Sequence, residues 1–199
     1  MAYILLTEDS EPELTAASLR KKKHYENKQR RIERLLMKRR EIRETIKLHG
    51  QDILTSDSFR STKNDVQHGT MSVNGHCKNV ATASLTINRT LHLNANKKDL
   101  VRGALLHDYF LYDWHDKEAT KGKKLHGFAH AAEALSNAER DFSLNDTQKE
   151  IIRSHMWPLN ITKIPRKKEA WIVTAADKYC SLMETIGIHK GILIKKNVE

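Results

Sequence analysis

The sequence has few cysteines and no long apolar run, and each absence excludes a class of protein. Only Cys77 and Cys180 occur in 199 residues, and they have no metal-type spacing. We expect both to be buried thiols in a reducing compartment rather than a disulfide. No apolar run approaches the roughly 20 residues that cross a bilayer, and the apolar residues 3–6 lead into acidic residues rather than a signal-peptide pattern. These absences predict a cytoplasmic protein with no membrane partner.

Proline and strand-like patterns are also scarce. The chain has three prolines and eight glycines, and neither type occurs between Pro12 and Gly50. Helix-forming residues dominate that stretch and predict one long helix over about residues 14–49. Elsewhere apolar residues recur at spacings of three and four, and no useful run alternates as a strand would. The sequence therefore predicts an all-α fold.

Most of the positive charge lies in the long N-terminal helix. The net charge of the chain is +10, and between Arg20 and Lys47 thirteen Lys or Arg face four Glu, a local balance of +9. A narrow Ile and Leu stripe on this helix predicts packing on the main domain or on a second copy of the chain, which would form a homodimer. The basic face leaves nucleic-acid binding open. Few aromatic side chains accompany these cations, which argues against base stacking.

The chain changes character after this helix. A polar stretch over residues 51–69 reads as a short helix and a loop. Eight of the eleven histidines lie between positions 68 and 155, from the end of this stretch onward. We therefore expect two parts, with residues 1–55 forming a basic amphipathic helical extension and residues 56–199 forming a helical domain that binds metal.

Ionisable side chains occupy positions where helices of the second part should be apolar. His76 lies on the apolar face of a helix predicted over residues 72–90, and the pair His107 and Asp108 ends an apolar helix capped by an asparagine. Asp177 likewise shares the apolar face of the last helix. Taken singly, each of these side chains could have a purely structural role. Burying a carboxylate without a partner, however, costs several kcal/mol of folding free energy. A divalent cation satisfies the whole set, because imidazole and carboxylate are its ordinary ligands.

The order His76, then His107-Asp108, then Asp177 resembles the His…His-Asp…Asp signature of the HD-domain metal-dependent phosphohydrolase superfamily. The resemblance covers about residues 67–185. It implies a compact HD-domain helical bundle in which these four residues bind a divalent metal. Some branches hold two metals, and the resemblance places His130 and His155 as the additional ligands, with Asp108 bridging. The implied cofactors are one or two divalent ions, chosen among Mn, Fe, Mg, Zn, Co and Ni.

The resemblance also implies a reaction. It predicts hydrolysis of a nucleotide or another small phosphoester, the phosphorylated substrate being attacked by a metal-activated water. Asp108 would bind metal and orient the nucleophile, and His126 is a candidate proton donor. His68 and Lys178 are candidates for contacts with the substrate phosphate. The alternative is a non-catalytic, metal-containing module that binds a regulatory ligand while the basic helix engages a partner or nucleic acid.

At two places the sequence differs from named branches of the superfamily. These differences exclude activities but do not identify the substrate. Residues 156–158, which follow His155, read Met-Trp-Pro, so the Gly-Tyr-Pro signature of cyclic dinucleotide phosphodiesterases is missing. Leu111 and Tyr112 stand where guanosine polyphosphate hydrolases carry Glu-Asp. Neither activity is therefore expected here.

Overall fold

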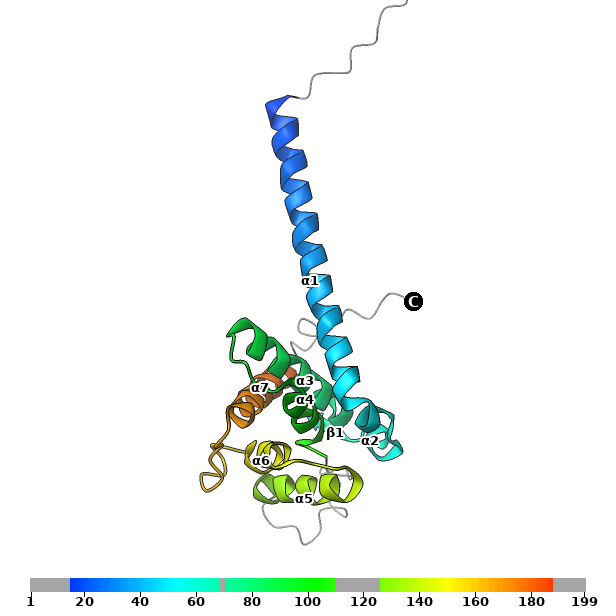
Figure 1. The fold of residues 1–199 in the computed structure, drawn as a ribbon, viewed down its shortest axis with the longest axis vertical. Coiled ribbons are helices and arrows are strands. Elements are labelled where there is room, and N and C mark those ends of the chain that lie inside the picture. Colours follow the sequence, from blue (N-terminus) through cyan, green and yellow to red (C-terminus); the bar gives the residue numbers. More distant parts are fainter. Residues whose placement is uncertain (1–14, 69–70, 110–125, 188–199) are drawn as a thin grey trace, which may run out of the picture. The chain divides into compact units, whose positions relative to one another are not determined.

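The described part of the chain is mainly helical, as a computed structural model shows (Figure 1). The structure describes residues 15–68, 71–109 and 126–187, with only the backbone described for 66–68 and 126–129. The helices in these residues are α1 (Ala16–Thr55), α2 (Asp57–Ser61), α3 (Val73–Thr90), α4 (Lys97–Leu106), α5 (His126–Asp141), α6 (Asp146–Ser154) and α7 (Lys168–Thr185). The predicted all-α fold with a long N-terminal helix is confirmed. None of the described helices is long and apolar enough to cross a membrane.

One small sheet was not expected from the sequence. Strands β1 (Val66–His68) and β2 (Met71–Ser72) pair antiparallel, immediately before α3. The sequence predicted a short helix and a loop here, with no alternating run of useful length, and these two short strands leave the all-α class unchanged. Strands of two and three residues are too short for alternation to be visible in a sequence.

Helix α1 is longer than the sequence predicted. It continues through Gly50 to Thr55 instead of ending near residue 49. A Cβ on Gly50 would lie 2.5 Å from Leu105 Cδ1 of α4, so the glycine permits a close helix approach rather than ending the helix. Ile46 and Ile53 are buried along the same face. The contacts divide the chain into two compact units, residues 1–41 and 42–199, so the last turns of α1 belong to the second unit.

Side-chain caps define the helices that carry the ionisable residues. The Asn96 side chain accepts a hydrogen bond from the Asp99 N–H, as its spacing predicted, and starts α4. Asn145 and Gln148 form a reciprocal capping box at the start of α6. The Ser72 side chain caps α3 by accepting a hydrogen bond from the Gly75 N–H. These caps fix where each helix begins and therefore which residues it turns inward.

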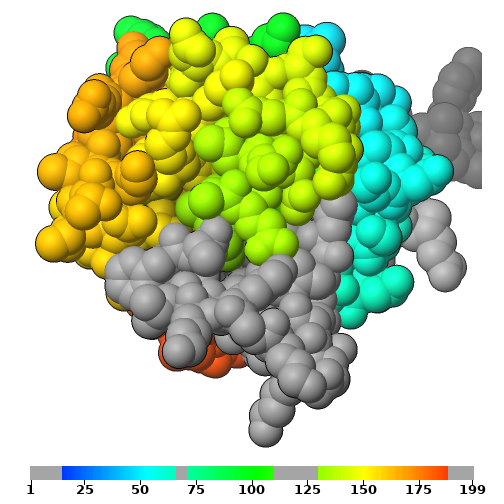
Figure 2. Space-filling view, turned by 90° about the horizontal axis from the view of Figure 1, so that it is seen from below, coloured from blue at the N-terminus to red at the C-terminus, as the bar shows by residue number. Residues whose placement is uncertain are grey.

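The core of the second unit lies among α3, α4, α6 and α7. Helix α4 packs against α3, α6 and α7, and α5 packs against α6. Figure 2 shows one face of this unit, where α5 and α6 lie side by side next to the start of α7. Gly103 of α4 makes the contact with α6 especially close, since a Cβ there would lie 2.5 Å from Ile151 Cδ1. This close packing brings the C-terminal ends of α4 and α6 close together.

Candidate metal centre

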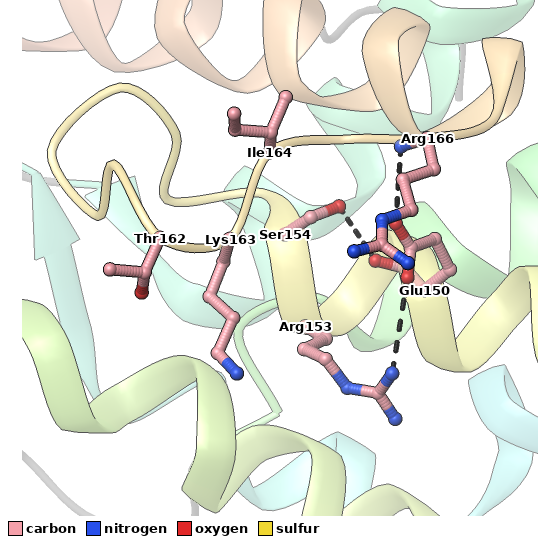
Figure 3. A pocket seen from close by; sticks show the side chains of 7 residues that line it. All are labelled: Glu150, Arg153, Ser154, Thr162, Lys163, Ile164 and Arg166. Carbon is pink, nitrogen blue, oxygen red and sulfur yellow. Dashed lines mark hydrogen bonds and ion pairs between the residues drawn. The ribbon is translucent and has the colours of Figure 1, made fainter.

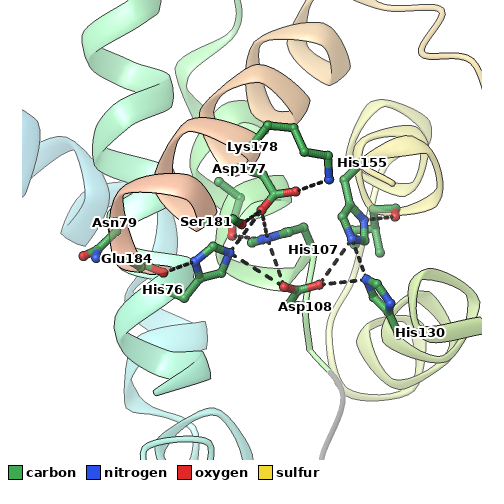
Figure 4. Close-up of polar contacts among 12 residues, drawn as sticks. His76, Asn79, His107, Asp108, His130, His155, Asp177, Lys178, Ser181 and Glu184 are labelled. Atoms are coloured by element: carbon green, nitrogen blue, oxygen red, sulfur yellow. Dashed lines mark hydrogen bonds and ion pairs between the residues drawn. The ribbon is translucent and has the colours of Figure 1, made fainter. Parts of the chain in front are cut away.

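The six side chains predicted as metal ligands meet in the interior of the second unit (Figure 4). All six are buried. They are His76 from α3, His107 and Asp108 from the end of α4, His130 from α5, His155 from the end of α6, and Asp177 from α7. Residues that are 101 positions apart in the sequence are thus brought into contact, as between His76 and Asp177.

Asp108 lies at the centre of this cluster. Its Oδ2 is 3.4 Å from His107 Nε2 and 3.7 Å from His76 Nε2. Its Oδ1 is 3.3 Å from His130 Nε2 and 3.2 Å from His155 Nε2. One carboxylate therefore stands between two pairs of imidazoles, with a different oxygen toward each pair.

These side chains form two groups that share Asp108. Within each group the ligand atoms lie within 4.8 Å of one another, in the described residues: His76, His107 and Asp108 form the first group, and Asp108, His130 and His155 form the second group. Asp177 joins the first group, because its Oδ1 is 3.2 Å from His76 Nε2 and 3.7 Å from His107 Nε2. The first group therefore contains two carboxylates, and the second group has only the shared one.

Hydrogen bonds behind three of the imidazoles orient them. His107 and His155 each follow the last residue of a helix, and their Nδ1–H groups donate to the carbonyls of Ala104 and Ile152, both at 2.8 Å. Such carbonyls lack an intrahelical partner at a helix end. His76 Nδ1 donates instead to Glu184 Oε2 at 2.7 Å. Because these partners can only accept, Nδ1 keeps its proton and Nε2 is the nitrogen of each ring that faces the cluster.

The chemistry of the donor set fits a divalent cation. His107 Nε2 is buried and makes no hydrogen bond within the described residues. Leaving a buried acceptor unsatisfied costs about 1–3 kcal/mol. Inward-facing imidazole nitrogens beside carboxylate oxygens are the ligands that divalent metals take in proteins. Either group could hold one ion through these atoms.

The two buried carboxyl groups are ionised. Burial alone would raise the pKa of Asp108, but the charge of His107 and the close contacts with His130 and His155 hold it well below its usual range. Burial acts in the same direction on Asp177, but contacts with His107 and His76 hold its pKa well below the usual range. Two negative charges in a buried site need cations beside them.

Protons supply part of that charge in the metal-free cluster. Burial lowers the pKa of His76, but its hydrogen bonds with Asp177 and Glu184 outweigh burial and raise the pKa to about 10. His155 behaves differently, because burial dominates over the attraction of Asp108 and its pKa is lowered. The charge of Asp108 likewise outweighs burial and raises the pKa of His107 well above its usual range. The first group therefore holds protons on His76 and His107 at neutral pH that a metal ion must displace, whereas His155 in the second group is ready as a neutral ligand.

Two further residues around the cluster were not predicted from the sequence. Glu184 is buried and, besides accepting from His76, accepts from Asn79 Nδ2 at 2.7 Å. Ser181 donates to Asp177 Oδ1 at 3.1 Å. A signal for Glu184 exists, because it lies seven residues after Asp177 and therefore on the same helix face.

Of the remaining predicted site residues, one lies at the edge of the cluster, and the side chains of two lie outside the described residues. Lys178 Nζ is 2.9 Å from Asp177 Oδ2, and its side chain is 43% exposed, so it lies between the cluster and solvent. His126 is the first residue of α5, and His68 is the last residue of β1. The side chains of both lie outside the described residues.

A separate hollow of about 400 Å³ lies between α6 and the segment that precedes α7 (Figure 3). Arg153, Lys163 and Arg166 supply positive charge around it. Glu150 lines it as well and accepts a hydrogen bond from the Arg166 backbone N–H at 3.1 Å. None of the six candidate metal ligands lines this hollow, so it is distinct from the cluster.

Comparison with known families agrees with this geometry. The family model for the HD domain matches residues 73–182. The matched range includes all six candidate ligands and ends two residues before Glu184. No match to the chain was found among curated proteins or among solved structures.

Proposed function

The chain belongs to the HD-domain family, since the family model matches more than half of it, and on this premise we propose that it hydrolyses a small phosphoester. Members of this superfamily are metal-dependent phosphohydrolases. The substrate class that we propose is a nucleotide or another small phosphorylated molecule. The metal-binding His and Asp groups fit such a reaction.

The position of Asp108 carries the proposal. Its two oxygens face two different pairs of imidazoles, and all five side chains are buried. A divalent metal, when bound, supplies Lewis-acid activation of water and neutralises phosphate charge. Asp108 would hold a metal and orient the attacking water by accepting a hydrogen bond from it. His76, His107 and His155 keep their Nδ1 protons turned outward, so each would offer Nε2 to a bound metal once any proton on Nε2 is displaced.

Residues at the margin of the cluster are proposed to handle the substrate. Lys178 extends from Asp177 toward solvent and would bind a non-bridging phosphate oxygen. His68 precedes the helix that carries His76 and would contact the same phosphate. His126 lies one helical turn before His130, where it would donate a proton to the leaving oxygen.

A hydrolysis assay on the full-length protein tests the proposal. Turnover of a generic phosphodiester and of a nucleotide panel is measured after loading with each candidate metal. Asp108→Asn is expected to lower kcat by at least about 1,000-fold, because it removes the shared ligand from both groups. Asp57→Asn, an exposed change of the same kind in α2, is the matched control and should leave kcat unchanged.

Three outcomes separate the candidate functions. Turnover that needs metal and is lost with Asp108→Asn supports the hydrolase. Wild-type turnover in that variant, or a protein that binds no divalent metal, contradicts it. Metal and nucleotide binding without turnover would instead favour a regulatory module.

A further inference from the structure

Residues 16–41 of α1 carry far more positive than negative charge. No side chain in this segment is buried. It contains eleven Lys or Arg and three Glu, a net charge of +8 within 26 residues. A helix with this charge repels itself, and its like charges at i and i+4 weaken it further. A polyanion would relieve both effects.

The cations surround the helix rather than forming one face. At 100° per residue, one cationic stripe contains Arg20, Lys23, Arg30, Arg34 and Lys38, which fall within about 80° of the circumference. Of the three glutamates of the segment, Glu41 at its C-terminal end falls within that arc, and Glu26 and Glu33 lie outside it. A second set of cations lies on the other side: Lys21, Lys22, Arg39 and Arg40.

The apolar residues do not form a face that could be buried broadly. Tyr25, Ile32 and Leu36 fall within an arc of about 40°. The second set of cations borders this arc on both sides. A helix that packs on a core or lies in a membrane surface needs an apolar face of about 100° or more. This segment therefore suits a partner that presents negative charge on several sides.

The groove of a nucleic-acid duplex has that property, because phosphates line both of its walls and the major groove of DNA admits an α-helix. A segment of 26 residues is about 39 Å long. Duplex DNA carries one negative charge per roughly 1.7 Å of its axis, so many phosphates lie within that length. We infer that residues 20–40 of α1 bind double-stranded nucleic acid through its phosphates, along a groove. This function goes beyond the proposed hydrolysis and does not depend on it.

Fluorescence anisotropy with the full-length protein tests the inference. Labelled 20-base-pair DNA and RNA duplexes are titrated at several KCl concentrations, and vesicles with anionic lipid form a parallel series. We expect the logarithm of the binding constant to fall linearly with the logarithm of salt concentration, with a slope of about −0.9 per neutralised phosphate. With six or more phosphates, affinity should fall by about 1,000-fold or more between 50 and 200 mM KCl.

Two triple variants of equal charge locate the binding surface. Arg30→Gln/Arg31→Gln/Arg34→Gln removes three cations from the helix, and glutamine keeps the helix propensity similar. Lys97→Gln/Lys98→Gln/Lys163→Gln removes three exposed cations from the second unit and is the control. The helix variant should reduce the salt slope by about 3, while the control keeps the wild-type slope.

The inference is overturned by any of three results. One is the absence of duplex binding at 50 mM KCl. Another is an equal loss of affinity in both triple variants, which would assign binding to overall charge. The third is binding to anionic vesicles in preference to either duplex, which would assign the helix to a lipid surface.

Discussion

At the scale of single residues, the histidines of the cluster differ in the group that accepts a hydrogen bond from Nδ1. His107 and His155 donate Nδ1–H to backbone carbonyls, whereas His76 donates to the buried carboxylate of Glu184. A carboxylate makes the imidazole a more basic ligand than a carbonyl does. Asn79 fixes the other oxygen of that carboxylate. The first group is therefore the more strongly electron-donating of the two.

Glu184→Gln is expected to weaken metal binding to the first group by about 10–100-fold. The substitution keeps the size of the side chain but removes the negative charge behind His76. Calorimetric titration with Mn²⁺ measures the affinity and the number of ions bound. The exposed Glu139→Gln of α5 is the matched control. Unchanged metal affinity in Glu184→Gln would show that the negative charge of Glu184 does not contribute to metal binding.

The pKa of His76 predicts how metal binding depends on pH. Because the pKa is raised to about 10, the metal-free cluster keeps this proton at pH 7 and a metal ion must release it. Metal affinity should therefore rise with pH, by up to about tenfold per unit, between about pH 6.5 and 10. The raised pKa of His76 also stabilises the metal-free protein against unfolding. This stabilisation is complete below about pH 6.5 and is lost as the pH rises through about 10.

Calorimetry in buffers of different ionisation enthalpy measures this release directly. About one proton per ion is expected from His76 at pH 7–8, and a second from His107, whose pKa is also raised. His155 contributes little, since its lowered pKa leaves it neutral in that range. Metal binding without proton release would mean that His76 is already neutral in the metal-free protein.

At the scale of elements, the sequence predicted helix positions most accurately where the capping residue and the apolar spacing indicate the same buried face. The cap at Asn96 and the apolar spacing after it located α4, and the spacing in α3 and α7 turned His76 and Asp177 inward. Each of these signals comes from residues within one or two helical turns. Local periodicity was therefore enough to place the candidate ligands on buried faces.

Contacts between distant segments explain what the sequence did not predict. Gly50 looked like a helix end, and only its close approach to Leu105 shows why the helix continues. Glu184 was overlooked because its role depends on a histidine 108 positions earlier in the chain. His126 and His68 stay predictions, because their side chains lie outside the described residues.

The crossing of α4 and α6 gives a test of this packing. Alanine normally stabilises a helix by about 1 kcal/mol relative to glycine. Gly103→Ala should nevertheless destabilise the protein by about 1–3 kcal/mol, because its Cβ would lie within 2.5–2.9 Å of three Ile151 atoms. Urea unfolding followed by circular dichroism measures the change.

Gly75→Ala of α3 is the control for that experiment. Its Cβ would meet the Sδ atom of Met71 at 2.6 Å, and a methionine side chain can move away. We expect this variant to be neutral or stabilised. Equal destabilisation in both variants would show that the α4–α6 contact is not unusually tight.

At the scale of the whole molecule, the two kinds of chemistry belong to different units. All six candidate ligands and Glu184 lie within residues 42–199, whereas the cationic helix segment lies within residues 1–41. The helix α1 runs through both units without a break. The boundary predicted after residue 55 and the division after residue 41 therefore assign the last turns of α1 differently, and that difference can be measured.

Two truncations decide between these boundaries. Removing residues 1–41 should leave the unfolding free energy and metal binding unchanged, because no side chain between 16 and 41 is buried. Removing residues 1–55 also deletes Ile46 and Ile53, whose burial contributes about 1.5–3 kcal/mol each. It also deprives Arg102 of Asp52, whose carboxylate oxygens accept from Arg102 Nη1 at 2.7 and 2.8 Å. Urea unfolding should therefore show a loss of at least about 3 kcal/mol for the shorter fragment only. Equal stability of the two fragments would place the boundary after residue 55 and make the end of α1 dispensable to the metal-binding unit.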